Sequence, residues 1–439
     1  MSFGEEGENM IASIAGGIAA GVSPVTLAEA CLARIEARNG QIRAMIHVDA
    51  PAVLESARRA EREMRNGLWR GPLHGVPVAV KDNLDVAGWP TRLGSRLFGQ
   101  SPASRTADCL VRLQERGAVL IGKTNMHELC AGGHANPWFG KVVNPLDPGR
   151  GTGGTSSGAA AAVAAGFCVA AIGTDTGGSN RSPAAATGLY GYKPGQGLIS
   201  TEGVCSMAPT LDSVGVLARS VADTRLIAEA LSGRTLSTVA PVGRLRIALC
   251  PELAGAAVDA AVSDAMGRWL DRPDVDLVEI RFPEAAALRE AGLTILLYEF
   301  ATGYTDPILA SPDLVGAAVR SFLDLGLAIS PESYCKALAT RQRFLRQMPL
   351  LMAGIDALAI PTCPGLAPRL EDEMTCVNGE WLPWGLAGGH FRRWANMLDM
   401  PALAIPLPLP GTLPASVQLG VLPGQDARLF DLAEALTQH

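Results

Sequence analysis

Residues 151–181 gather hydroxyl side chains among glycines and alanines, in the run GTGGTSSGAAAAVAAGFCVAAIGTDTGGSNR. Side chains this small cannot fill a core by volume, but they let a backbone approach a ligand closely. The stretch GTDTGGS ends a predicted strand in four consecutive amides, those of Thr176, Gly177, Gly178 and Ser179. A concave turn of amide donors stabilises the oxyanion of an acyl transfer, and a serine hydroxyl delivered into it is an acyl acceptor. Taken alone, Ser179 is more simply a loop serine that caps the next turn.

A serine nucleophile needs a base, and lysine is the side chain that this sequence offers for the role. Histidine is scarce, with six residues, and only five of the 37 lysines and arginines are lysines. The lysines are Lys81, Lys123, Lys141, Lys193 and Lys336. A buried amine can be neutral at pH 7, whereas a guanidinium stays charged. Lys81 ends the apolar run GVPVAVK, a predicted strand, and is the best-placed base, although any one of these lysines alone is more simply a charge partner.

Four other patterns suggest different chemistry, but each lacks the neighbouring elements or residues that the corresponding site requires. Residues 149–154 match GxGxxG with Asp175 at the spacing of a dinucleotide site, but turn residues rather than a strand precede them. GTSSG matches the nucleophile elbow around Ser156, which also needs a preceding strand and a later histidine. Residues 333–336 match SxxK without its companion motifs, and HELCA, which starts at His127, lacks the second histidine of a zinc hydrolase. We therefore expect no metal and no organic cofactor.

Composition excludes several classes of protein. Apolar residues make up 48% of the chain, which excludes a disordered protein. A net charge of −6, with both signs well mixed, gives no basis for binding nucleic acid or an anionic membrane. The start, MSFGEEGENM, is too acidic for a signal peptide, and no run is long and apolar enough to span a membrane. Nine scattered cysteines fit free thiols, so we expect a cytoplasmic protein.

Strand and helix patterns alternate along the chain, which predicts an α/β fold with helices on both faces of a sheet. The predicted strands are 75–82, 118–125, 167–174, 245–250, 356–362, 402–408 and 416–422. The predicted helices are 25–38, 51–65, 159–166, 221–232, 255–270, 331–348 and 427–437. Residues 232–243, which contain serines and a proline, are the one candidate for an internal seam.

Five blocks of this chain, in order, resemble the successive blocks of the amidase signature family. They are GVPVAVKDN, GKTNMHE, GGTSSGAAAAVAAG, GTDTGGSNRSPAA and GLYGYKP. The blocks lie within about residues 71–215, and weaker likeness extends to both ends. The resemblance implies a single large α/β/α domain over residues 1–439, built around a mixed, mostly parallel twisted sheet. It also implies that residues 216–400 form a variable region around the substrate pocket, and that catalysis uses a Ser–cis-Ser–Lys triad.

The resemblance gives each matching residue a role. Lys81 corresponds to the base, Ser179 to the nucleophile, and the amides from Thr176 to Ser179 to the oxyanion hole. The family's middle residue, a serine after a cis peptide bond, falls on Thr155, so a threonine stands where a serine is usual. Either the hydroxyl of Thr155 relays the proton or neighbouring Ser156 has taken the role, and we favour Thr155.

Residues around the nucleophile have supporting roles. The resemblance implies that Asp175 and Arg181 brace the nucleophile loop. Asn180 and Ser182 are more polar than usual at their positions, which favours a small polar amide, with surface exposure as the plain alternative. Weaker candidates for pocket residues, each of which also fits simple packing, are Met126, His134, Trp138, Tyr298 and Tyr304.

The resemblance therefore implies an amidohydrolase that cleaves a carboxamide to an acid and ammonia or an amine. Its partner would be a small-molecule amide, and a homodimer is left open. One alternative is a glutaminase of the type found in glutamine-dependent amidotransferases, which works with partner chains. Another is a catalytically weakened member of the family retained for binding, to which Thr155 gives some weight.

Overall fold

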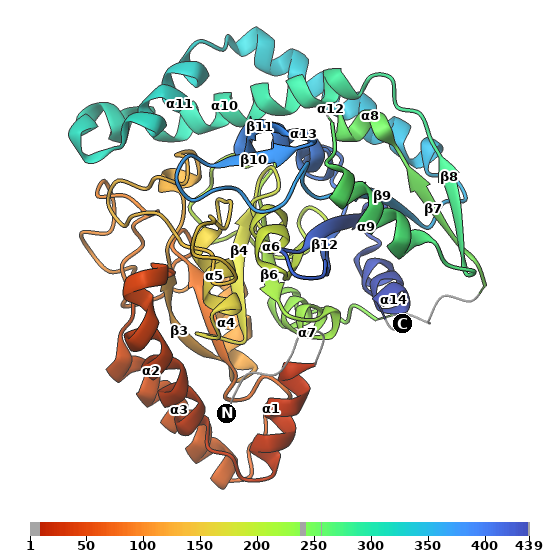
Figure 1. The fold of residues 1–439 in the computed structure, drawn as a ribbon. Helices are drawn as coiled ribbons and strands as arrows, with labels where there is room; N and C mark the ends of the chain where they lie inside the picture. Colours follow the sequence, from red (N-terminus) through yellow and green to blue (C-terminus); the bar gives the residue numbers. More distant parts are fainter. Residues whose placement is uncertain (1–8, 238–242, 256, 438–439) are drawn as a thin grey trace.

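The computed structural model describes residues 9–237, 243–255 and 257–437, which build one continuous sheet with helices packed against it (Figure 1). The sheet has eleven strands in the order β1-β3-β2-β4-β6-β5-β12-β13-β9-β7-β8. Their bounds are β1 Met45–His47, β2 Pro77–Lys81, β3 Val119–Thr124, β4 Ala170–Asp175, β5 Tyr190–Lys193, β6 Ser213–Ala218, β7 Leu245–Leu249, β8 Val275–Glu279, β9 Ala357–Pro361, β12 Ala402–Leu407 and β13 Ala415–Gly420. The predicted α/β fold with a mixed sheet is therefore confirmed.

The directions of the strands differ from the expectation of a mostly parallel sheet. Six of the ten neighbouring pairs are antiparallel, and the four parallel pairs join β2 to β3 and β4, and β7 to β8 and β9. A parallel neighbour requires a long crossover, usually a helix. No helix separates β5 from β6 or β12 from β13 along the chain, so each pair lies side by side with opposite directions.

Helices connect most of the strands, and a second layer lies at the top in Figure 1, where α10, α11 and α12 run over α13. The bounds of the helices are α1 Met10–Ala19, α2 Pro24–Ile42, α3 Ala50–Arg65, α4 Asp108–Glu115, α5 Ser157–Ala164, α6 Arg181–Thr187, α7 Val221–Ser232, α8 Pro251–Ala254, α9 Ala260–Leu270, α10 Ala285–Ala310, α11 Ala317–Leu327, α12 Pro331–Leu351, α13 Trp384–Met397 and α14 Asp426–Thr437. Short 3₁₀ turns cover Glu128–Cys130 and Pro312–Leu314, and the hairpin of β10 (Met374–Val377) and β11 (Glu380–Pro383) precedes α13.

The alanine-rich helix α5 packs against β2 and β4, the two strands that carry the site. Its alanines from 159 to 162 are all fully buried, and side chains of this size let the helix lie close to the sheet. Gly158 is required by this closeness, because a Cβ there would lie 2.4 Å from the carbonyl oxygen of Ala44 and 2.5 Å from the amide of Asn125. The concentration of small residues in the sequence is thus explained by tight packing as well as by chemistry.

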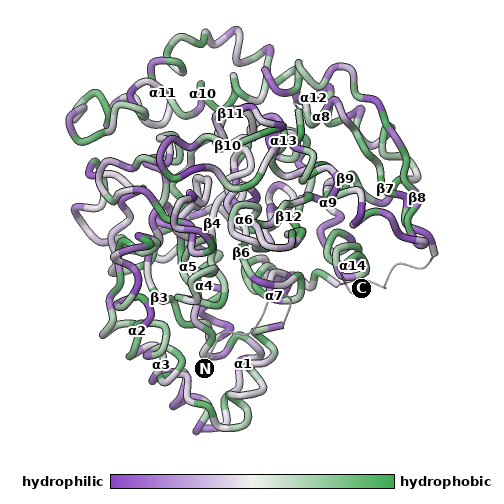
Figure 2. Tube along the Cα trace, in the orientation of Figure 1, coloured by the Kyte–Doolittle hydropathy of each residue, from purple (hydrophilic) through white to green (hydrophobic). Residues whose placement is uncertain are grey.

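The core has two large parts. One lies between the sheet and the helices that cover it, and the other fills the space among α10, α11, α12 and α13. Outer helices such as α2 and α3 carry mixed colours in Figure 2, as expected of helices with one buried and one exposed face. Within the described residues, no helix combines the length and the hydropathy needed to cross a bilayer.

Most predicted elements match observed ones in place. The predicted strand 75–82 contains β2, and the predicted helix 221–232 coincides with α7. The predicted helix 255–270 begins later, because Gly255 ends the short helix α8 and α9 starts at Ala260. Part of the predicted seam, residues 238–242, lies outside the described residues.

Candidate active site

The site begins where β2 and β4 end. These neighbours are parallel, with Val78 opposite Ala170 and Val80 opposite Ile172, so their carboxyl ends meet at the same edge of the sheet. Lys81 is the last residue of β2, and Asp175 is the last of β4. Both strands are buried along their whole length, which carries the amine of Lys81 into a site shielded from water.

Lys81 has no exposed surface, and its amine contacts two threonine hydroxyls. Nζ lies 2.9 Å from Oγ1 of Thr155 and 2.8 Å from Oγ1 of Thr174, with the Thr174 carbonyl oxygen 3.5 Å away. Burial lowers the pKa of Lys81, while the nearby Cys130 thiol and the carboxylates of Asp212 and Asp175 act in the opposite direction. An amine in this setting can hold a neutral form that accepts a proton.

Thr155 follows a cis peptide bond from Gly154, at the position expected from the sequence. Its carbonyl oxygen accepts a hydrogen bond from the amide of His127, 3.2 Å away. The ring of His127 packs on Gly154, where a Cβ would lie 2.2 Å from Cε1 of the ring, so glycine is required there. Thr155 lines a cavity that Lys81 does not itself line.

Ser156 faces away from the cavity and holds the loop. Its hydroxyl lies 3.0 Å from Oδ1 of Asn180 and 3.2 Å from the carbonyl oxygen of Thr174, and the side chain is fully buried. Its amide donates to the carbonyl oxygen of Ser179 over 3.2 Å. These contacts are structural, and they leave Thr155 as the hydroxyl between Lys81 and the cavity.

Ser179 lines the same cavity, in the turn between β4 and α6. Gly178 in this turn has a φ of 110°, a conformation that favours glycine. The Gly178 amide donates to Oδ1 of Asp175 over 2.8 Å. The amides of Thr176, Gly177 and Ser179 donate to no acceptor among the described residues. The turn therefore offers three free amides rather than the four expected from the sequence.

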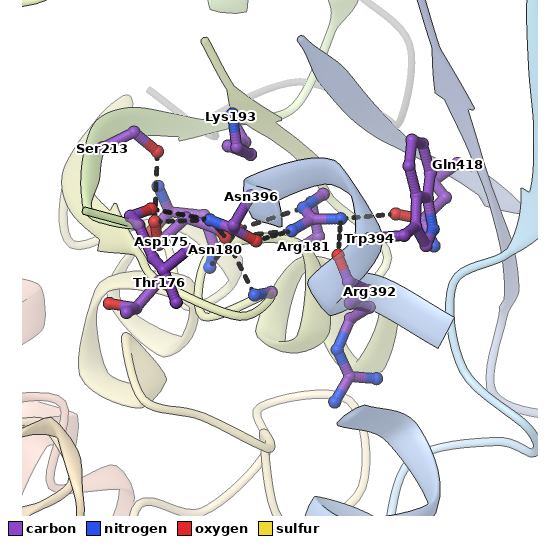
Figure 3. Close-up of polar contacts among 12 residues, drawn as sticks. Asp175, Thr176, Asn180, Arg181, Lys193, Ser213, Arg392, Trp394, Asn396 and Gln418 are labelled. Atoms are coloured by element: carbon purple, nitrogen blue, oxygen red, sulfur yellow. Dashed lines mark hydrogen bonds and ion pairs between the residues drawn. The ribbon is translucent and has the colours of Figure 1, made fainter. Parts of the chain in front are cut away.

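A buried ion pair braces this turn, as Figure 3 shows. Arg181 donates from Nε and Nη2 to the carboxylate of Asp175 over 3.1 and 3.0 Å, and both side chains are fully buried. Asn396 adds a donor to Asp175 at 3.0 Å, and Gln418 accepts from Arg181 over 2.7 Å. Burial alone would raise the pKa of Asp175, but the Arg181 guanidinium and the other donors hold it well below its usual range. The pair therefore stays charged and fixes the turn that contains Ser179.

The cavity has a volume of about 310 Å³ and joins residues from distant parts of the chain. Its polar and charged lining comes from His127, Cys130, Thr155, Thr176, Ser179, Ser182, Glu373, Arg392 and Arg393. Its apolar lining comes from Met207, Leu293, Leu296, Phe322 and Trp384. Among the residues that the structure describes, no group of three or more histidines, cysteines or acids is placed to hold a metal ion.

Four side chains expected to contact a substrate do not line this cavity, and each has another role. Asn180 is buried and accepts from the Ser156 hydroxyl. Met126 is buried in the core cluster among the upper helices. His134 lies 2.9 Å from Oε2 of Glu373, and Tyr298 stacks on Tyr334 with ring centroids 4.3 Å apart.

Two further candidates from the sequence, Trp138 and Tyr304, also bond within the protein, to Glu128 and to the Ser206 carbonyl oxygen. Ser182, by contrast, lines the cavity and accepts from Nε1 of Trp384 over 3.1 Å. The SxxK pattern lies on α12 away from the cavity, where Lys336 pairs with Glu332 at the surface.

The part of the cavity wall that α13 contributes was not predicted from the sequence. Arg392 and Arg393 lie on α13, directly before the WANMLDMPALAIPLP segment. The two adjacent arginines ahead of an apolar segment were the only sequence feature that could have indicated this wall. No local pattern indicated that they lie near Ser179. Cys130 was likewise unassigned, and burial raises the pKa of its thiol although Lys81 lowers it. The thiol is therefore neutral beside Lys81.

The chain is similar to known proteins in sequence and in fold. Residues 26–430 match the protein family described as Amidase. The chain is 34% identical over 470 aligned positions to the A-subunit of the glutamyl-tRNA(Gln) amidotransferase from Anaeromyxobacter sp. (strain K), with 97% of this chain and 94% of that relative covered. It is 34% identical over 408 positions to an amidase from Pseudomonas putida, with 88% and 86% covered. A crystal structure of an amidase superposes with a TM-score of 0.88 at 32% identity, covering 94% of this chain and 95% of that one.

Proposed function

The chain belongs to the amidase family of hydrolases, and from this premise we propose that it cleaves a small carboxamide through an acyl-enzyme on Ser179. The observation that carries the proposal is the contact of 2.9 Å between Lys81 Nζ and Thr155 Oγ1 at the base of the cavity that Ser179 lines. This contact supports Lys81 as the base and Thr155 as the relay to Ser179, because proton transfer requires a base, a relay and a nucleophile in sequence.

In the first half of the reaction, neutral Lys81 takes the proton of the Thr155 hydroxyl as Thr155 takes the proton of Ser179. The Ser179 oxygen attacks the amide carbonyl carbon, and the carbonyl oxygen becomes an oxyanion. The free amides of Thr176, Gly177 and Ser179 are the donors available to that oxyanion. The braced pair of Asp175 and Arg181 holds these donors in place before the substrate arrives.

The second half returns the proton and releases the products. The leaving nitrogen accepts a proton from Lys81 through Thr155 as its bond to the carbonyl carbon breaks, giving ammonia or an amine. A water molecule then attacks the ester on Ser179 and loses its proton along the same route. Ser179 regains its hydrogen, and the acid leaves the cavity.

The volume of the cavity favours a small substrate. About 310 Å³ lies at the lower end of the range for ligand pockets. Ser182 and the free amides offer polar contacts, whereas Leu293 and Phe322 close the other side with apolar surface. These features support a short amide over a long acyl chain or a peptide.

A second candidate function rests on the relative named as part of a glutamyl-tRNA(Gln) amidotransferase. A chain of that type would release ammonia from glutamine for use by a partner chain. The two candidates differ in whether the purified chain alone turns over simple amides.

The test is ammonia release by the purified chain from a panel of short amides that includes glutamine, with Ser179→Ala as the control. The proposal predicts turnover of at least one short amide by the chain alone and none by the variant. Turnover of glutamine alone, and only after partner chains are added, would support the amidotransferase candidate. Equal ammonia release by the Ser179→Ala protein would exclude the proposed nucleophile.

A further inference from the structure

We infer that the substrate of this site carries a carboxylate, which the guanidinium groups of Arg392 and Arg393 bind beside the nucleophile turn. The inference rests on the proposed amide hydrolysis and names the class of amide, a monoamide of a small dicarboxylic acid. Both arginines line the same cavity as Ser179 and Thr155.

Arg392 is packed against the nucleophile turn. A Cβ built on Gly178, the residue before Ser179, would lie 2.5 Å from Nε of Arg392. The arginine is only 4% exposed, and one of its nitrogens, Nη1, lies 3.1 Å from both the Thr362 carbonyl oxygen and the Cys363 sulfur. Its Nε is buried without a hydrogen-bond partner, which is a costly state for a charged donor. Its other terminal nitrogen, Nη2, donates to no acceptor among the described residues and is not buried, so the guanidinium that lines the cavity has a donor available to a bound anion.

The guanidinium of Arg393 has even fewer hydrogen-bond acceptors within the protein than that of Arg392. Its Nε is also buried without a partner, and its guanidinium donates to no acceptor among the described residues. Burial, and then the charge of Arg392, lower the pKa of Arg393 to about 10, so it stays cationic at neutral pH. A Cβ on Gly177 would lie 3.4 Å from its Nε, which places this second cation beside the same turn.

Asp175 acts on Arg392 from a distance, but no carboxylate of the described residues is in contact with either arginine. Across the residues that the structure describes, neither forms an ion pair with an acid. The acidic side chain of the cavity is Glu373, and its Oε2 is already 2.9 Å from Nδ1 of His134. Buried like charges without a counter-ion are unfavourable, and a substrate carboxylate would relieve that cost on binding.

A neighbouring cavity is also lined by basic groups. A second cavity of about 270 Å³ shares Leu293, Gly389 and Arg393 with the first, and Arg289 and His390 add to its lining. Among the described residues that line it, Glu290 is the one acid, and the two cations of Arg289 and Arg393 outnumber it, while burial lowers the pKa of His390. The positive charge beside the site would attract an anionic substrate.

Arg181 ties this subsite to the nucleophile. Its Nη1 donates to the carbonyl oxygen of Arg392 over 2.8 Å, while Nε and Nη2 hold Asp175 (Figure 3). One fixed guanidinium therefore sets both the start of the nucleophile turn and the backbone that carries Arg392. The separation between the reacting carbonyl and the bound carboxylate is fixed by the fold, which favours one short chain length over others.

The test compares amides that differ only in charge. Succinamate and butyramide have the same carbon chain, and a carboxylate replaces a methyl group in the first. We expect the wild-type chain to prefer succinamate, or its shorter or longer homologue, over the neutral amide of equal length. Arg393→Gln should lower kcat/KM for the charged amide by about 100-fold, mainly through KM, and change that of the neutral amide by less than about threefold.

Arg343→Gln is the matched control, because this exposed arginine contacts Glu284 at the surface. This variant should leave kcat/KM unchanged for both the charged and the neutral amide. If Arg393→Gln weakens both amides equally through kcat, the arginine acts on the oxyanion and the inference is wrong. If neither amide is affected, the inference is also wrong.

A binding measurement separates this inference from the proposed reaction. Calorimetric titration of the Ser179→Ala protein with malonate, succinate and glutarate needs no catalysis, and at least one of the three should bind. Combining Arg392→Gln or Arg393→Gln with Ser179→Ala should weaken that binding by about 100-fold, with circular dichroism confirming the fold. Should Arg392→Gln unfold, the Arg393→Gln result decides. Absence of binding by all three acids overturns the carboxylate subsite even if amides are hydrolysed, whereas hydrolysis by Ser179→Ala overturns the reaction and leaves the subsite standing.

Discussion

Lys81 Nζ lies 2.9 Å from Oγ1 of Thr155, and Thr155, not Lys81, lines the cavity that contains Ser179. The threonine hydroxyl therefore connects the amine to the cavity, and the Cys130 thiol, which also lines the cavity, lies beside the same amine. The methyl group of Thr155 does not prevent this contact with Lys81, which supports the proposal that a threonine acts here where the family resemblance implies a serine. The presence of threonine at position 155 is therefore not by itself a reason to expect a catalytically weakened enzyme.

Replacing Thr155 tests the relay directly. Thr155→Val keeps the shape of the side chain and removes the hydroxyl, so turnover should fall by about 100- to 10,000-fold, the usual range for acid–base assistance. Thr155→Ser should keep or raise turnover, because the oxygen remains. Steady-state kinetics on one amide measures both, and a Thr155→Val protein with near wild-type turnover would exclude the relay.

Ser156→Ala is the matched control for that pair. The Ser156 hydroxyl contacts Asn180 and the Thr174 carbonyl oxygen rather than the cavity. Its loss should therefore cost far less turnover than Thr155→Val. The opposite order of the two variants, both shown to be folded by circular dichroism, would make Ser156 the relay.

Lys81→Arg should be as damaging as Lys81→Ala. An arginine keeps a positive charge but cannot accept a proton near neutral pH. If Lys81 were only a charge partner for Asp212 and Asp175, the arginine variant would retain most of its activity. Measured kcat/KM values for the two variants distinguish these roles.

The pH dependence of activity follows from the shifted pKa of Lys81. Burial lowers this pKa, and the working form is the neutral amine, so kcat/KM should rise with pH as Lys81 loses its proton and fall as the pH drops. The acidic limb should follow one ionisation in initial-rate measurements between about pH 5 and 10. A rate that falls on raising the pH through this range would contradict a lysine base.

The ion pair of Asp175 and Arg181 should matter for stability as well as for activity. Asp175→Asn leaves the fully buried guanidinium of Arg181 without its counter-ion, which typically costs about 3–5 kcal/mol. Glu284→Gln breaks the surface pair with Arg343 and should cost less than about 1 kcal/mol. Denaturant unfolding compares the two, and equal small losses would show that the buried pair is not a brace.

The strands and the position of Lys81 at a strand end could be predicted because their signals are local. The run PVAVK of β2 is apolar, β-branched and bounded by turn residues, and Lys81 stands at its end. The polar turn after β4 could be identified in the same way from its glycines. Helix α10 was missed because its 26 residues carry apolar side chains on more than one face, together with Gly292, Gly303 and Pro307. A helix packed by α11, α12 and α13 has no single apolar stripe to detect.

The wall of the cavity could not be predicted because it is assembled by long-range contacts. Arg392 and Arg181 are 211 positions apart, and only the folded sheet brings α13 beside the nucleophile turn. Met126, His134 and Tyr298 were expected to line the pocket. Instead, Met126 packs in the core, His134 contacts Glu373, and Tyr298 stacks on Tyr334. A local sequence pattern therefore predicts where a strand ends, but it does not predict which distant residues line the pocket beside that strand end.

The most direct measurement is to identify the residue that carries the acyl group. Ser156 and Ser179 share the tryptic peptide 151–181, so fragment ions of that peptide must place a trapped adduct or a phosphonofluoridate label. We predict the label on Ser179, with labelling abolished in Ser179→Ala and strongly slowed in Lys81→Ala. A label on Ser156 or Cys130 in the wild-type protein, or undiminished labelling of the Ser179→Ala peptide, would contradict the proposed acyl-enzyme.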